Sequence, residues 1–174
     1  SAYHNIPFAT KANGFGGLDT ELTFNSPVHI KHIQTLGKWA QEGKFTYMGR
    51  RNEAGKNFRA GECMLMTESS AGYAGIKKAA KFEFGIRHLP YYGGTKAPQN
   101  TIIGGSSLWA LSGKSAEENK GTAAFLAFLS KTDIQAKWHQ DTGYLGVTKA
   151  AAKKTKSSGF YKKNPGTDLA GIQM

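Results

Sequence analysis

The sequence has little of what would place it in several large protein classes. Its one cysteine, Cys63, cannot form a disulfide within the chain, so the redox compartment stays open. It has no run of about 18 apolar residues, which excludes a membrane-spanning helix. The first ten residues, SAYHNIPFAT, lack the charged and then apolar layout of a secretory signal, as those of a mature secreted chain also would.

The sequence also lacks the motifs of common catalytic sites. It contains no Walker loop, no G-x-S-x-G nucleophile elbow, no H-E-x-x-H zinc motif and no paired-carboxylate motif. His29 and His32 lie three residues apart on an expected helix, but no third ligand accompanies them. A solvated helix face is therefore favoured over a metal site. We expect no catalytic residue, no metal and no cofactor.

Acidic residues are scarce: the chain has 12 of them and 23 lysines and arginines, so its net charge is +11. A basic nucleic-acid-binding module is therefore one hypothesis, although no arginine-aromatic recognition motif supports it. Much of the excess lies at the carboxyl end, where a solvated lysine face on a helix accounts for it and could attract an anionic ligand. The lysines there, against the single acid Asp168, are Lys149, Lys153, Lys154, Lys156, Lys162 and Lys163.

The first half of the chain alternates between helical and strand-like patterns. Ser26 and Pro27 predict the start of a helix that ends at Gly43, and Phe45 to Tyr47 predicts a short strand. Residues 62–68 and 82–89 predict two further strands, the first of them buried, with a helix over 70–81 between them. This strand, helix, strand order favours an α/β fold.

Two serines, Ser69 and Ser70, lie where the first of these two strands meets the helix. A helix N-terminus presents unpaired N–H groups and a partial positive charge, so serines there can bind a phosphate or carboxylate. This junction also motivates a second hypothesis, an enzyme acting on a phosphorylated small molecule, although no nucleophile or base accompanies it. Serine is moreover the ordinary cap of a helix, and capping alone is the favoured interpretation of these residues.

The stretch from Ala97 to Thr148 has the most informative pattern. After Pro98 and a polar turn, it predicts a strand interrupted by Gly104 and Gly105, which resumes over 106–111. A helix capped by Ser115 with Glu118 as its capping-box partner follows, and then a second helix that begins with Thr132 and Gln135. Gly143 ends the second helix, and the aromatic Tyr144 comes directly after it.

The paired glycines and the tyrosine each allow two interpretations. Without Cβ atoms, the backbone at Gly104 and Gly105 could approach a ligand closely, and Tyr144 could close over a small molecule from its exposed turn. A tight corner and a half-buried tyrosine explain the same residues without a ligand, and from the residues alone these are favoured.

Several runs resemble one known family. The runs HNIPFATKANGFGGLDTEL, ESSAGYA, LPYY, APQNTIIGGSSLW and WHQDTGYL are similar to the extracellular solute-binding family 1 of bacterial ABC importers, and ESSAGY and NTIIGG point to its glycerol-3-phosphate-binding subfamily. The resemblance covers the chain from about His4 to Met174. It implies a type II periplasmic-binding-protein-like α/β architecture of two lobes with the ligand in the cleft, of which this chain is a fragment holding mainly the carboxyl-terminal lobe.

The resemblance also implies a role. It implies a non-catalytic protein that captures sn-glycerol 3-phosphate, or related glycerophosphodiesters, in the periplasm, with a signal peptide that is not in this chain. Its partners would be this phosphorylated polyol ligand and the membrane permease subunits of an importer with a cytoplasmic ATPase, and nucleic acid would not be among them. No cofactor is implied.

Carried over by position, the ligand contacts of the family fall on Ser69, Gly105 and Tyr144, with Ser70 and Gly104 as neighbours if the register differs by one residue. The resemblance also assigns residues to lobes. Residues 1–102 and 145–174 would belong to the carboxyl-terminal lobe, and 103–144 would supply a crossover strand and helices that pack on the other lobe. If that lobe is absent, Phe125, Phe128 and Trp138 should be exposed.

Overall fold

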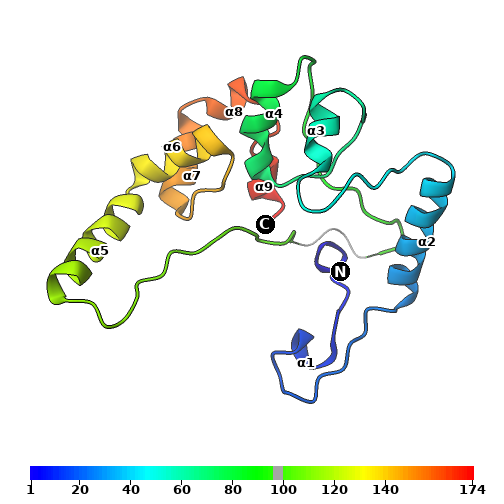
Figure 1. The fold of residues 1–174 in the computed structure, drawn as a ribbon, viewed down its shortest axis with the longest axis horizontal. Coiled ribbons are helices and arrows are strands. Elements are labelled where there is room, and N and C mark those ends of the chain that lie inside the picture. Colours follow the sequence, from blue (N-terminus) through cyan, green and yellow to red (C-terminus); the bar gives the residue numbers. More distant parts are fainter. Residues whose placement is uncertain (96–99) are drawn as a thin grey trace. The chain divides into compact units, whose positions relative to one another are not determined.

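The computed structural model describes residues 1–95 and 100–174, so Pro98 and its turn lie outside the described residues (Figure 1). The contacts divide the chain into two units. The first comprises Ser1–Asn57, Leu89–Ile103 and Gln173–Met174, and the second comprises Phe58–His88 and Gly104–Ile172. The helices are, in chain order, η1 (Ala2–His4), α1 (Thr10–Asn13), α2 (Pro27–Gln41), α3 (Ala54–Arg59), η2 (Ser70–Gly72), α4 (Tyr73–Ala79), α5 (Ala116–Leu129), α6 (Thr132–Thr142), α7 (Lys149–Ser157), α8 (Phe160–Lys163) and α9 (Leu169–Ile172).

The predicted helices of the chain are confirmed, because their start and stop signals are local. Helix α2 has Ser26 at its N-cap and Pro27 in its first turn, and it ends two residues before Gly43, which has a φ of 69°. In α5 the capping box is complete, since Ser115 and Glu118 each accept a hydrogen bond from the other's backbone N–H. The hydrogen bond from the Ser115 backbone N–H, and to a lesser degree the Ser115 side chain, lowers the pKa of the Glu118 carboxyl. Helix α6 begins at Thr132, as predicted, with Lys131 as its N-cap.

The predicted strands are not formed. Within residues 1–95 and 100–174 the β-type pairing is a single isolated bridge between Ala9 and Leu22. Residues 45–47, 62–68, 82–89 and 106–111 are irregular. The prediction of a buried strand over 62–68 is wrong, because Met64 and Leu65 are 96% and 91% exposed. A strand needs the ladder of hydrogen bonds that a neighbouring strand supplies, and none of these segments has such a neighbour among the described residues.

The histidine pair of α2 is engaged in hydrogen bonds within the first unit. The His29 ring bonds the hydroxyls of Ser1 at 2.7 Å and Ser26 at 2.8 Å, and the His32 ring bonds the Tyr92 hydroxyl at 3.1 Å. Among the described residues, no group of three or more His, Cys, Asp or Glu side chains is placed to hold a metal ion. The two rings therefore connect α2 to Ser1 and Tyr92, which lie outside this helix.

The second unit is built around α4, α6, α7 and α8, which lie together in Figure 1. Helix α6 packs on α7 and α4, and α7 packs on α8. Two of the buried residues along these helices are alanines, with Ala136 3% exposed and Ala151 1% exposed, and such small side chains let the helices approach closely. Ile76 of α4 is the large apolar side chain of this core. The helix predicted for the lysine-rich end is confirmed as α7.

Helix α5 and the outer face of α6 carry uncovered aromatic rings. Phe125, Phe128 and Trp138 are 55%, 46% and 53% exposed, which confirms the predicted exposed surface. Helix α5 is stabilised at its amino end by its capping box rather than by a buried face, since none of its residues is buried. Among the helices described, none is both long and apolar enough to cross a membrane.

Candidate functional site

Ser69 caps the first turn of the helical segment formed by η2 and α4. Its hydroxyl accepts a hydrogen bond from the N–H of Ala71 at 3.3 Å, and its own N–H donates to the carboxylate of Glu68 at 2.8 Å. The ordinary capping role considered from the sequence is therefore present. Ser69 is exposed, so its hydroxyl remains within reach of solvent.

The Glu68 side chain lies along this first turn. A Cβ built on Gly72 would come within 2.5 Å of the Glu68 Cγ and 3.2 Å of its Cδ. Glycine at position 72 thus makes room for the Glu68 side chain. The Glu68 carboxylate therefore places a negative charge from the chain itself beside the backbone donors at the start of the helix, a position that favours negative charge.

Gly143 brings the end of α6 against this same junction. It has a φ of 86°, and a Cβ built on it would lie 2.2 Å from the Ser70 carbonyl oxygen. Only glycine fits a left-handed backbone with so little space. This close approach brings together the serine junction (Ser69 and Ser70) and the Gly-Tyr loop (Gly143 and Tyr144). From the sequence, only the family resemblance connects these two segments to the same ligand.

Tyr144 follows directly and is 46% exposed. Its N–H donates to the Thr142 hydroxyl at 3.2 Å, and its carbonyl oxygen accepts a hydrogen bond from Nδ1 of His139 at 2.8 Å. The backbone of Tyr144 is therefore bonded on both sides, while much of its side chain faces solvent. An anchored backbone with an exposed phenol suits a residue that contacts a small ligand.

Gly104 and Gly105 lie in an irregular segment of the second unit. A Cβ built on either glycine would meet no atom within 4 Å, although Gly105 has a φ of 114°. The described contacts therefore bring Ser70 and Gly143 together but do not bring the glycine pair to them. The surroundings are open, with Ile103 75% and Trp109 84% exposed. The tight corner considered from the sequence is not observed at this pair.

The structure adds polar residues that the sequence analysis missed. His139 is 4% exposed and Asn164 is 8% exposed, and both make hydrogen bonds to residues near the site. His139 lies three positions after the buried Ala136, on the same face of α6. A polar residue at helical spacing from a core position was the signal available for His139, whereas Asn164 lies beyond a short helix and offers no such pattern.

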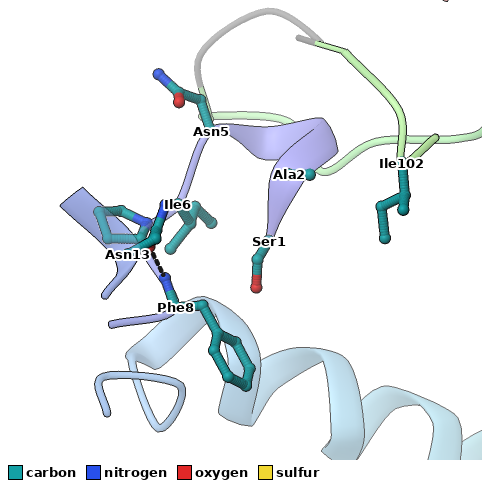
Figure 2. Close-up of a pocket in the computed structure, with 8 residues that line it drawn as sticks. Ser1, Ala2, Asn5, Ile6, Phe8, Asn13 and Ile102 are labelled. Carbon is teal, nitrogen blue, oxygen red and sulfur yellow. Dashed lines mark hydrogen bonds between the residues drawn. The ribbon is translucent and has the colours of Figure 1, made fainter. Parts of the chain in front are cut away.

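A separate hollow lies in the first unit and has a volume of about 490 Å³ (Figure 2). One of its polar side chains, Asn13, already has a partner, because its Oδ1 accepts the N–H of Phe8 at 2.8 Å. No Asp, Glu, Lys, Arg or His side chain is among its lining residues. The lining residues are Ser1, Ala2, Asn5, Ile6, Pro7, Phe8, Asn13 and Ile102.

Comparison with known proteins places this geometry in context. The chain is 50% identical over 175 residues to the sn-glycerol-3-phosphate-binding periplasmic protein UgpB of Pectobacterium atrosepticum, and 50% identical over 174 residues to that of Rhizobium meliloti. It is 49% identical over 175 residues to that of Escherichia coli. Each alignment covers 100% of this chain, but the chain spans only about 40% of the length of these relatives.

A family-level comparison agrees with these relatives. Residues 1–168 match the bacterial extracellular solute-binding proteins, which is nearly the whole chain of 174 residues. The match confirms the resemblance carried by the ESSAGYA and WHQDTGYL runs. Residues Ser69, Ser70, Gly143 and Tyr144 all lie within the matched range. The chain belongs to the bacterial extracellular solute-binding protein family.

Proposed function

We propose that this chain is part of the substrate-binding component of an ABC importer that captures sn-glycerol 3-phosphate, with glycerophosphodiesters as the related ligand class. The observation that carries the proposal is the identity of about 50% along the entire chain to proteins named for binding this ligand. The protein would bind without catalysis in the periplasm. It would deliver the ligand to membrane permease subunits that work with a cytoplasmic ATPase.

The proposed ligand contacts are Ser69, Gly105 and Tyr144, with Ser70 and Gly104 beside them. The close approach of Gly143 to the Ser70 carbonyl supports a shared site for the serine junction and Tyr144. Hydroxyls and backbone N–H groups near the start of a helix are suitable donors to a phosphate. Gly105 would complete the site through its backbone when the second wall of the cleft is in place.

The arrangement of lobes belongs to the same proposal. Residues 1–102 and 145–174 would form parts of the carboxyl-terminal lobe of a type II binding protein, and 103–144 would pack on the other lobe. The exposed rings of Phe125, Phe128 and Trp138 support this, because apolar surface of this kind is normally covered. Half of a cleft supplies only part of the donors, so the 174-residue chain alone should bind the ligand weakly.

Glu68 sets a condition on ligand binding. Its carboxylate accepts the Ser69 N–H at 2.8 Å, so a phosphate approaching this donor meets a negative charge already in place. Like charges at short range disfavour each other. The ligand would either displace the Glu68 side chain or bind through the hydroxyl of Ser69 and the ring of Tyr144. The net charge of +11 would favour the arrival of the anion in both cases.

The proposal is tested in a chimaera in which residues 1–174 replace the matching segment of the Rhizobium meliloti relative, whose alignment spans 174 residues. We expect Ser69→Ala and Tyr144→Ala each to weaken binding of sn-glycerol 3-phosphate in calorimetry about tenfold, the equivalent of one or two lost hydrogen bonds. Ser112→Ala and Tyr47→Ala are matched controls at exposed positions. Unchanged affinity in both site variants would contradict the site.

A further inference from the structure

His139 of α6 is almost completely buried, and both of its ring nitrogens are hydrogen-bonded. Nδ1 lies 2.8 Å from the carbonyl oxygen of Tyr144, and Nε2 lies 3.0 Å from the hydroxyl of Tyr161 in α8. The side chain is 4% exposed, so water does not compete freely for either bond. The ring therefore connects the loop that carries Tyr144 to α8.

The chemistry of the partners determines the tautomer of the ring. A carbonyl oxygen can only accept, so Nδ1 must carry the proton that is donated to Tyr144. In the neutral ring Nε2 is then an acceptor, and the Tyr161 hydroxyl donates to it. Both bonds favour the same tautomer of the neutral ring, because a proton on Nε2 alone would leave the Tyr144 carbonyl without its donor and the Tyr161 hydroxyl without its acceptor.

The surroundings of Tyr161 favour its role as the donor. Burial raises the pKa of the phenol, and the negative charge of Asp168 raises it further, so the hydroxyl keeps its proton. The His139 ring meets the rings of Tyr161 and Phe160 edge to face, with centroids 5.7 and 5.9 Å apart. These contacts hold the imidazole plane, and hence the direction of its Nδ1–H.

A second set of bonds connects the same short helix to the serine junction. The Asn164 amide, just after α8, accepts the hydroxyl of Tyr73 at 2.9 Å and donates to the Phe160 carbonyl at 2.9 Å. Tyr73 begins α4 directly after η2, the turn that Ser69 caps. Thus α8 is bonded both to the segment of Ser69 and to the loop of Tyr144.

We propose that His139, held in one tautomer by Tyr161, is a positioning residue that fixes the Tyr144 loop against the serine junction for ligand binding. This rests on the proposed function only in assuming that Tyr144 contacts the ligand. Neither His139 nor Tyr161 touches the ligand in this account. Their effect on affinity passes through the Tyr144 backbone.

The first test needs no ligand. In the 174-residue chain, two-bond ¹⁵N–¹H correlations should show the His139 ring with its proton on Nδ1, although the free imidazole favours Nε2. Tyr161→Phe removes only the hydroxyl and should shift the ring toward the Nε2–H form, with a changed amide signal for Tyr144. Tyr47→Phe, at a tyrosine that is 70% exposed, is the control and should change neither. An Nε2–H ring in the unmodified chain would overturn the proposal.

The second test measures affinity for sn-glycerol 3-phosphate in the chimaera. Tyr161→Phe should weaken binding about fivefold, the effect of one hydrogen bond. His139→Asn, which places an amide N–H near the Nδ1 position, should retain more affinity than His139→Gln, which does not. Equal affinity of Tyr161→Phe and the unmodified chimaera would overturn the positioning role while leaving the proposed function intact. Failure of the unmodified chimaera to bind would instead contradict the proposed function, and the ring tautomer would still decide the positioning role.

Discussion

The Gly143→Ala variant is expected to lose roughly 3 kcal/mol of unfolding free energy, well above a typical surface substitution. Two costs add at this position. The left-handed backbone, with a φ of 86°, is unfavourable for alanine, and the new Cβ would lie 2.2 Å from the Ser70 carbonyl oxygen. Neither group can move aside as a flexible side chain could, so α6 and the serine junction must separate. Chemical denaturation followed by circular dichroism measures the loss.

Gly159→Ala is the matched control for this substitution. Gly159 has a φ of 76°, but a Cβ built there would meet no atom within 4 Å. It should therefore show the backbone cost alone, about 1 kcal/mol. Equal losses in the two variants would mean that Gly143 and Ser70 are not in close contact in solution, and the candidate site would lose its main structural support.

The Asn164→Ala variant should also be strongly destabilised, by about 2–3 kcal/mol, because three hydrogen bonds of one buried side chain are lost together. The Asn164 amide oxygen accepts from the Tyr73 hydroxyl at 2.9 Å and from the Lys77 ammonium at 2.5 Å, and its nitrogen donates to the Phe160 carbonyl. Asn164 itself is 8% exposed, so water does not readily take its place beside the half-buried Tyr73, although the exposed Lys77 can bond to solvent instead. Thermal unfolding of the 174-residue chain measures the change.

The control for this variant is Asn119→Ala on α5. The Asn119 amide also donates to a carbonyl, that of Lys114 at 3.2 Å, but the side chain is exposed and water can replace the bond. Its loss should stay below about 0.5 kcal/mol. Similar losses for the two asparagines would show that the bonds of Asn164 do not join α8 to α4 in solution.

Helix boundaries could be predicted from the sequence because their signals lie within a few residues of each helix end. Ser115 and Glu118 predict the start of α5, and Gly143 predicts the end of α6. The strands could not be predicted in the same way. The apolar run around Met64 has the composition of a buried strand, but whether it forms one depends on a neighbouring strand that the local sequence does not contain.

The candidate site shows the same division between local and distant information. Ser69 and Tyr144 could be proposed as site residues because each lies beside a helix end and within a family motif. That Gly143 approaches Ser70 depends on how α6 packs on α4, which no local pattern specifies. The hydrogen bonds of His139 could not be predicted either, since its partners come from the loop at Tyr144 and from Tyr161 in a different helix.

We propose that the serine junction and the Gly-Tyr loop form one phosphate site. The most direct test is a titration of the chimaera with sn-glycerol 3-phosphate, followed by the backbone amide signals of the two segments. We predict that the amides of Ser69–Ala71 and of Gly143–Tyr144 shift together, saturate at the same ligand concentration and do not respond to glycerol. Shifts in only one segment, or in neither, would contradict the claim.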